Sequence, residues 1–136
     1  MSHISTIKSR LNNIVATQKF VQSMKDKGFS WVKNGQVRYY GGRVVQCENV
    51  IRCPGQYDIG VRKEGDKLLL DADWNYADFY SYFGVQRNDQ KGVETKILEG
   101  QNEFEFRSWA DERGYAVEEV VDEVTGKRRL EVPLYT

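Results

Sequence analysis

Three aspartates on two neighbouring segments are the residues best suited to chemistry in this chain. Asp71 and Asp73 are two positions apart, so their side chains project to the same face of a strand. Asp58 precedes them in a segment with the same alternation and falls on its polar side. Clustered carboxylates suit a hard divalent cation such as magnesium, or acid–base catalysis when burial raises the pKa of one of them.

His3 is the only histidine in the chain, and together with the three aspartates it makes up the candidate polar site. A histidine beside an aspartate can act as a base, but no serine or cysteine nucleophile motif accompanies this one. The simpler interpretation is a solvated sheet face, on which Arg62 and Lys67 pair with the aspartates across the strands. We therefore assign no catalytic residue, expect no cofactor, and leave open whether the aspartate face binds a metal.

The segments that carry these aspartates predict a β-hairpin. Apolar and polar residues alternate on both sides of Glu64-Gly65-Asp66, which has the composition of a tight turn. This period of two gives each strand one apolar face. The residues of that face are Tyr57, Ile59 and Val61 before the turn and Leu68, Leu70, Ala72 and Trp74 after it.

The elements before this hairpin predict the start of an α+β fold. Residues 3–11 alternate like a strand, and the helical stripe that follows begins at Asn12 or Asn13 and ends at Gly28. Asn34-Gly35 is a strong hairpin signal, which predicts a turn between strands at 29–32 and 36–40. A further strand covers 43–53. The economical arrangement is one domain, residues 1–136, with an antiparallel meander of about four or five strands.

The second half predicts a helix and a final hairpin. Asn75 could cap a short helix with Asp78, residues 84–100 are polar and favour a mobile loop, and a helix covers 101–113. We expect this helix and the first one to pack on one face of the sheet. Strands at 115–123 and 129–135 complete the chain. Because both helices end in a glycine and an aromatic residue before a hairpin, the pattern is compatible with an internal helix–hairpin duplication.

Composition places the chain among ordered proteins and outside the membrane-spanning class. It has 136 residues with 29% charged and 40% hydrophobic side chains, which is enough for one core. No apolar run approaches the roughly 18 residues that a membrane span requires, and the first residues lack signal-peptide architecture. Two cysteines, Cys47 and Cys53, are expected as free thiols in a reducing compartment, so we predict a cytoplasmic protein.

The charges are distributed unequally along the chain. Residues 1–53 carry nine Lys or Arg and two acids, whereas residues 54–136 carry eleven Lys or Arg and eighteen acids. A basic region interleaved with aromatic residues suits single-stranded nucleic acid. The candidate residues for this role are Lys33, Arg38, Tyr39, Tyr40 and Arg43. The simpler interpretation is that the two halves interleave in one fold and neutralise each other.

A dense aromatic segment follows the predicted central hairpin. It contains only one acid, Asp78, and its candidate partner-binding residues are Tyr76, Phe79, Tyr80, Tyr82 and Phe83. Such a segment beside a loop either closes the core or forms an interface with a partner protein. The sequence leaves both interpretations open.

Several short motifs in a fixed order resemble a known family. They are the N-terminal residues 1–8, residues 57–60, residues 71–74 and the joint at Gly114-Tyr115. Together they resemble a domain-of-unknown-function family of small proteins found in cyanobacteria, red-algal plastids and some phages. The resemblance covers nearly the whole chain, with His3, Asp58, Gly60, Asp71, Asp73 and Trp74 at the motif positions. It implies a small accessory protein and supplies no catalytic residues.

These observations favour a non-enzymatic accessory or adaptor protein that acts by contact with a partner protein. The alternatives are a nucleic-acid-binding module that uses the basic first half and a small metal-dependent enzyme that uses Asp58, Asp71 and Asp73. No membrane partner is expected. The resemblance extends the expected location from the cytoplasm to the plastid stroma, or to the host cytoplasm for a phage protein.

Overall fold

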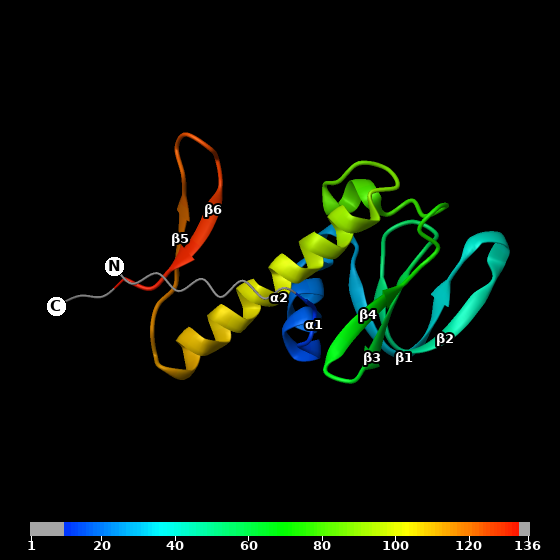
Figure 1. Ribbon diagram of the computed structural model, residues 1–136, viewed down its shortest axis with the longest axis horizontal. Helices are drawn as coiled ribbons and strands as arrows, with labels where there is room; N and C mark the ends of the chain where they lie inside the picture. Colours follow the sequence, from blue (N-terminus) through cyan, green and yellow to red (C-terminus); the bar gives the residue numbers. More distant parts are fainter. Residues whose placement is uncertain (1–9, 134–136) are drawn as a thin grey trace.

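The computed structural model describes residues 10–133 and shows an α+β fold. Four strands form an antiparallel meander in the order β1-β2-β3-β4, two helices pack together, and a small hairpin of β5 and β6 lies at the far end of the longer helix (Figure 1). This confirms the predicted fold class. The elements are α1 (Ile14–Ser23), β1 (Ser30–Arg38), β2 (Val44–Arg52), β3 (Ile59–Glu64), β4 (Lys67–Asp71), α2 (Gln90–Glu112), β5 (Glu118–Val121) and β6 (Arg128–Glu131).

The central hairpin has the predicted strands and the predicted turn. In the β3–β4 pairing Val61 lies opposite Leu70 and Glu64 opposite Lys67, so Gly65 and Asp66 form the two-residue turn. Gly65 has a φ of 63°, the left-handed conformation that such a turn favours. The apolar face of the hairpin enters the main core. That core contains Val21, Phe29, Ile51, Ile59, Val61, Leu68, Phe79, Tyr80, Phe83, Val93 and Ile97.

The start of α1 is fixed both locally and by a contact from α2. Asn13 is the N-cap, and its side chain accepts a hydrogen bond from the Ala16 N–H. The fully buried Gln101 of α2 accepts hydrogen bonds from the backbone N–H groups of Asn12 and Asn13, both at 2.8 Å. The first turn of α1 is therefore tied to the middle of α2.

The second helix is much longer than the sequence predicts. Residues 84–100 were expected to form a mobile loop, but α2 begins at Gln90, after the N-cap Asp89, and continues to Glu112. The expectation was wrong because it treated glycine as a loop signal. Gly100 instead lies against Phe20 of α1, where a Cβ would come within 2.1 Å of the ring. Its missing side chain lets the two helices approach closely.

The predicted turn at Asn34-Gly35 is also wrong. Both residues lie inside β1, which pairs with β2 in one continuous register from Ser30–Arg52 to Arg38–Val44. The chain reverses later, at Gly41 and Gly42, where φ is 74° and 78°. Asn34 keeps a left-handed φ of 52°, so the signal marks a bend within the strand rather than its end.

The segment after β4 is capped differently from the prediction. Its turn is closed by Asp73, whose carbonyl accepts hydrogen bonds from Tyr76 and Ala77, and only a short 3₁₀ helix follows, Tyr80–Phe83. Asp78 is not the acid of a capping box at Asn75. Its carboxylate instead accepts from the Gln56 N–H, because the 53–58 connection runs alongside this segment.

The two chain ends differ from the prediction where they are described, because residues 10 and 11 are not part of a strand. The strand predicted at 3–11 lies mostly outside residues 10–133, but the Leu11 carbonyl accepts from the Leu68 N–H at 2.9 Å. The final hairpin is shorter than expected, and its last predicted residues also lie outside the described part. The first helix ends earlier than predicted, at Ser23, and Gly28 with a φ of 96° closes the short 3₁₀ turn Lys25–Lys27 that follows it. Gly114, with a φ of 69°, comes directly after the C-cap of α2, so a helical segment, a glycine and a hairpin follow one another twice. Within residues 10–133, neither helix is long and apolar enough to cross a membrane.

Candidate functional site

The aspartates of the predicted polar site each have a different environment. Asp58 is fully buried, whereas Asp71 and Asp73 are half-buried. Arg62 pairs with Asp71, Nε to Oδ2 at 2.8 Å, as the solvated-face interpretation expected, while Lys67 lies at the turn. Residues 10–133 contain no group of three potential metal ligands drawn from His, Cys, Asp and Glu. His3 lies outside this described range.

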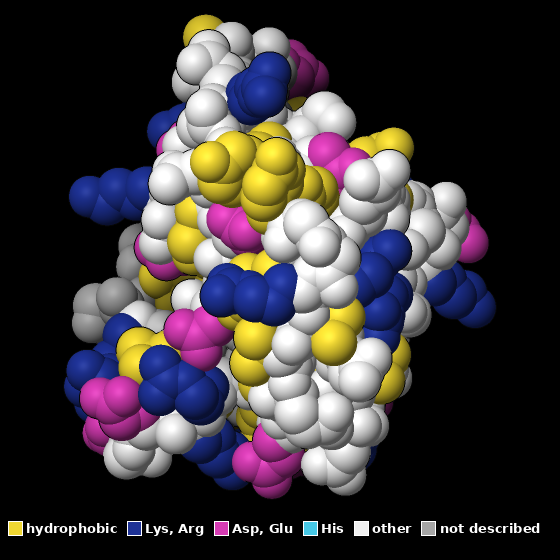
Figure 2. All heavy atoms as spheres, turned by 90° about the vertical axis from the view of Figure 1, so that its right-hand side faces the viewer, with side chains coloured by type: hydrophobic (Ala, Val, Ile, Leu, Met, Phe, Trp, Pro, Cys, Tyr) yellow, Lys and Arg dark blue, Asp and Glu magenta, His cyan; other side chains and the backbone are white. Residues whose placement is uncertain are grey.

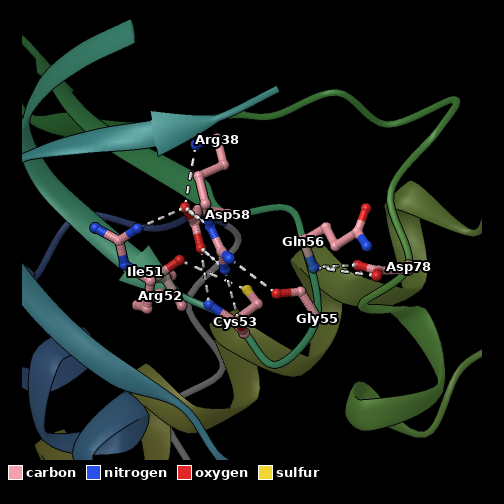
Figure 3. A network of polar contacts seen from close by, with 8 residues as sticks. All are labelled: Arg38, Ile51, Arg52, Cys53, Gly55, Gln56, Asp58 and Asp78. Atoms are coloured by element: carbon pink, nitrogen blue, oxygen red, sulfur yellow. Dashed lines mark hydrogen bonds and ion pairs between the residues drawn. The ribbon is translucent and has the colours of Figure 1, made fainter. Parts of the chain in front are cut away.

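Asp58 is the centre of a network that joins β1, β2 and the connection before β3 (Figure 3). Its carboxylate accepts from Arg38 Nε and Nη2, both at 2.8 Å, and from Arg52 Nη1 at 3.1 Å. The backbone N–H groups of Arg38 and Cys53 complete its partners. Because the buried charge is paired and hydrogen-bonded at both oxygens, this network anchors the bent β1–β2 hairpin.

The two cysteines are free thiols in different surroundings. Cys53 is buried beside Asp58, and desolvation, followed by the Asp58 charge, raises the pKa of its thiol well above the usual value. Such a thiol is a poor nucleophile. Cys47 is half-buried and points its sulfur at the Val61 carbonyl, 3.7 Å away.

The aromatic segment divides between the core and the surface. Phe79, Tyr80 and Phe83 are buried in the core cluster, so they cannot belong to an exposed partner surface as predicted. Only Tyr76 and Tyr82 remain exposed, at 55% and 44%. Core closure therefore accounts for most of this segment.

The residues predicted to bind nucleic acid are only partly brought together. Tyr39, Tyr40 and Arg43 lie at the end of the β1–β2 hairpin, with the Arg43 guanidinium 4.9 Å from the centre of the Tyr39 ring. Arg38 is held by Asp58. Lys33 is exposed inside β1, directly before the bend at Asn34 and five residues from Arg38.

The basic and acidic halves of the chain interleave in space. Arg38 and Arg52 of the basic half pair with Asp58 of the acidic half. Arg10 likewise pairs with Asp66 at 2.6 Å. The charge asymmetry along the sequence is thus reduced by pairing in the folded chain, as the simpler interpretation expected.

Exposed apolar side chains gather where the hairpin end meets the turn after β4. The rings of Tyr40 and Tyr76 stack with their centroids 4.3 Å apart, although both side chains are more than half exposed. Val44 is 46% exposed, and it lines one hollow together with Tyr57. We call the exposed Tyr40, Val44 and Tyr76, together with the partly buried Tyr57, the tyrosine surface. Figure 2 views the face on which the hairpin lies and shows hydrophobic side chains gathered in its upper half, with acidic ones beside them.

Two hollows flank the hairpin end. The first, of about 350 Å³, lies between Tyr39, Gly41, Arg43 and Tyr57. The second, of about 500 Å³, separates the hairpin from β3 and β4, and its lining residues are Val37, Tyr39, Val45, Gln46, Cys47, Gly60, Arg62, Asp71, Ala72 and Trp74. Both are open depressions, and the smaller one is lined in part by Val44 and Tyr57 of the tyrosine surface.

Three residues of this region were not among the predicted site residues. Val44 was expected only as a strand residue, Tyr57 as part of the buried hairpin face, and Asp78 as a helix cap. Tyr57 is partly buried and packs against the core, as the hairpin pattern predicted, and it also lines the smaller hollow. No sequence pattern indicates that Tyr40 meets Tyr76, since they are brought together by the bend of the hairpin.

Comparisons with known proteins add no relative: no family model, no curated protein and no solved structure matches the chain.

Proposed function

We propose that this protein is a non-enzymatic accessory or adaptor module that binds a partner protein through the tyrosine surface. Contact with a partner protein is the function that the sequence also favours, but the binding residues differ. Most of the segment 76–83 lies in the core, so the residues proposed to bind are Tyr40, Val44, Tyr57 and Tyr76. The observation that carries it is the exposed stack of Tyr40 on Tyr76.

The stack is held in place before any partner arrives. The Tyr40 N–H donates to Asp73 Oδ2 at 2.9 Å, which ties the hairpin end to the turn that carries Tyr76. Asp58 fixes the adjoining end of β1 through Arg38. Rigid tyrosines give a large contact area at low entropic cost, and tyrosine is enriched at energetically important interface positions. A preorganised tyrosine pair therefore supports a binding role.

The enzyme alternative receives less support from the same geometry. Asp58 is fully buried and engaged by two arginines, and Asp71 is paired with Arg62. Asp73 accepts from the backbone of the hairpin. Each carboxylate thus has a structural partner of its own, and the three do not line one depression.

Nucleic acid remains the second candidate, on the observation that Tyr39, Tyr57 and Arg43 face one hollow. Aromatic rings and a guanidinium together suit unstacked bases. We rank this function second because the donors of Arg38 are occupied by Asp58, Gly55 and Cys53. A polyanion would then have few free cations to neutralise here.

Site-specific photocrosslinking in a lysate of the cells that naturally make the protein tests the binding proposal. A benzophenone amino acid replaces Tyr40, Tyr76 or, as a matched control, the exposed Tyr82. We expect the same discrete protein adduct from positions 40 and 76 and none from 82. A Tyr40→Ala, Tyr76→Ala variant that keeps its melting temperature should lose this partner in a competition assay. Identical adduct patterns at all three positions would overturn the proposal.

The same lysate experiment addresses where the protein works. We propose a reducing compartment, the cytoplasm or a plastid stroma, because both cysteines are free thiols and one is buried in the core. A crosslinked partner that resides in a reducing compartment would support this location, and a partner from an oxidising compartment would contradict it.

A further inference from the structure

Two carboxylates border the tyrosine surface. Asp73 accepts a hydrogen bond from the backbone N–H of Tyr40, and Asp78 accepts from the backbone N–H of Gln56, next to Tyr57. Asp78 is also two residues from Tyr76 along the chain. Both carboxylates are therefore fixed beside the exposed rings by backbone contacts.

Neither of these carboxylates forms an ion pair within the described part of the chain, although Arg38 lies close enough to Asp78 to interact with it electrostatically. Asp58, Asp66 and Asp71 all form ion pairs with arginines, whereas residues 10–133 show no ion pair at Asp73 or Asp78. Their only hydrogen-bond partners there are backbone N–H groups, which leave the negative charge in place. The side of the tyrosine surface next to Tyr40 and Tyr57 thus carries two carboxylates outside any ion pair, while Arg43, whose guanidinium lies over Tyr39, lines the hollow on its other side.

Besides desolvation, the negative charges of these carboxylates raise the pKa values of the nearby tyrosines Tyr57 and Tyr39. The pKa of Tyr57 is raised, first by desolvation and then by Asp73 and Asp78. The pKa of Tyr39 is raised by desolvation and by Asp71, with a smaller contribution from Asp73, while Arg43 opposes the shift. A negative potential at aromatic rings favours a cation over their faces.

The protein already contains one such contact. Arg43 places its guanidinium over the Tyr39 ring at the rim of the smaller hollow. This shows that a ring at the hairpin end can accept a guanidinium in this setting. Tyr40 and Tyr76 each use one face of the ring to stack on the other residue. Because both side chains are more than half exposed, a partner can reach the rings from solvent.

We propose that the partner reaches the tyrosine surface with a basic segment, whose Lys or Arg side chains lie over the rings and pair with Asp73 and Asp78. The inference rests on the proposed protein-binding function and specifies the chemistry of the partner. Charge complementarity selects a basic protein segment and disfavours a nucleic acid strand, whose phosphates would meet the two carboxylates.

Fluorescence anisotropy with defined probes tests this inference directly. The probes are a labelled decapeptide of alternating Arg and Gly, a peptide of the same length with Glu in place of Arg, and an oligothymidine. We expect saturable binding of the Arg peptide alone at low salt, weakening as added salt shortens the Debye length. Preferential binding of the oligothymidine or of the Glu peptide would overturn the inference.

Asparagine variants separate the charge from the structure. Asp73→Asn combined with Asp78→Asn keeps an oxygen acceptor at each position but removes both charges. We expect binding of the Arg peptide to weaken by about tenfold, the effect of two surface ion pairs. The control, Asp66→Asn with Asp111→Asn, changes the net charge equally at exposed positions elsewhere and should leave binding unchanged. Equal weakening by both variants would refute a local role for Asp73 and Asp78.

The two proposals can fail separately. Suppose that a partner is crosslinked at Tyr40 and Tyr76, and that its capture depends neither on salt nor on the charges of Asp73 and Asp78. This result would contradict the basic-segment inference but would still support the binding function. Absence of any position-specific adduct would remove the binding function. Arg-peptide binding that Tyr40→Ala with Tyr76→Ala does not weaken would then show that the peptide binds elsewhere, which also overturns the inference.

Discussion

Arg38 and Asp58 form a two-bonded ion pair that ties the closed end of the β1–β2 hairpin to the connection before β3. Arg38 Nε and Nη2 each lie 2.8 Å from a different oxygen of Asp58, and the Asp58 carboxylate is fully buried. Arg38 also donates to the carbonyls of Cys53 and Gly55. The pair thus holds the end of β1 against the connection that leads into β3, and it positions the neighbouring Tyr40.

Replacing Asp58 with asparagine is expected to lower the free energy of unfolding by about 3 kcal/mol, because it leaves two arginines without their anion in a buried network. Urea denaturation followed by circular dichroism measures this change. Asp71→Asn is the matched control, since its ion pair with Arg62 is exposed and should cost at most about 1 kcal/mol. Equal effects of the two variants would contradict an anchoring role for Asp58.

Gly100→Ala should destabilise the protein by about 1–2 kcal/mol, although alanine favours a helix more than glycine does. The new Cβ would meet the Phe20 ring, and overpacking at a close helix contact exceeds the gain in helix propensity. Thermal denaturation of Gly100→Ala, Phe20→Leu and the double variant measures the coupling. Recovery of stability in the double variant, relative to the sum of the single changes, is the expected sign of this contact.

Tyr80→Ala combined with Phe83→Ala is expected to unfold the protein or to lower its stability by more than 4 kcal/mol, because both rings are buried in the core. Tyr82→Ala, on the same 3₁₀ helix but exposed, should change stability by less than about 0.5 kcal/mol. Thermal melts of the two variants give the comparison. A stable, folded double variant would mean that these side chains do not close the core.

Cys53 should resist thiol reagents in the folded protein, whereas Cys47 should react measurably. Burial disfavours the Cys53 thiolate, and its raised pKa keeps it protonated at neutral and mildly alkaline pH. The number of thiols titrated by a coloured disulfide reagent, before and after adding denaturant, measures the difference. Cys53→Ser isolates the Cys47 signal, and rapid modification of Cys53 in the native state would contradict its placement.

Much of the fold follows from local sequence pattern. Alternation at Ile59, Val61, Leu68 and Leu70 determined the central hairpin and its buried face, because a period of two on a strand has only one apolar side. Likewise, Asn13 fixed the start of α1 and Gly114 the end of α2, through a side-chain hydrogen bond and a left-handed backbone angle that are local properties.

Only the tertiary structure decided how the remaining signals are used. Asn34-Gly35 bends a strand because pairing with β2 along the whole of β1 outweighs its local preference for a turn. Gly100 lies in a helix contact because it packs on Phe20. The same holds for the binding surface. Sequence singled out Tyr40 and Tyr76 separately, 36 positions apart, but their stacking depends on how the anchored hairpin bends onto the turn after β4, which no local pattern encodes.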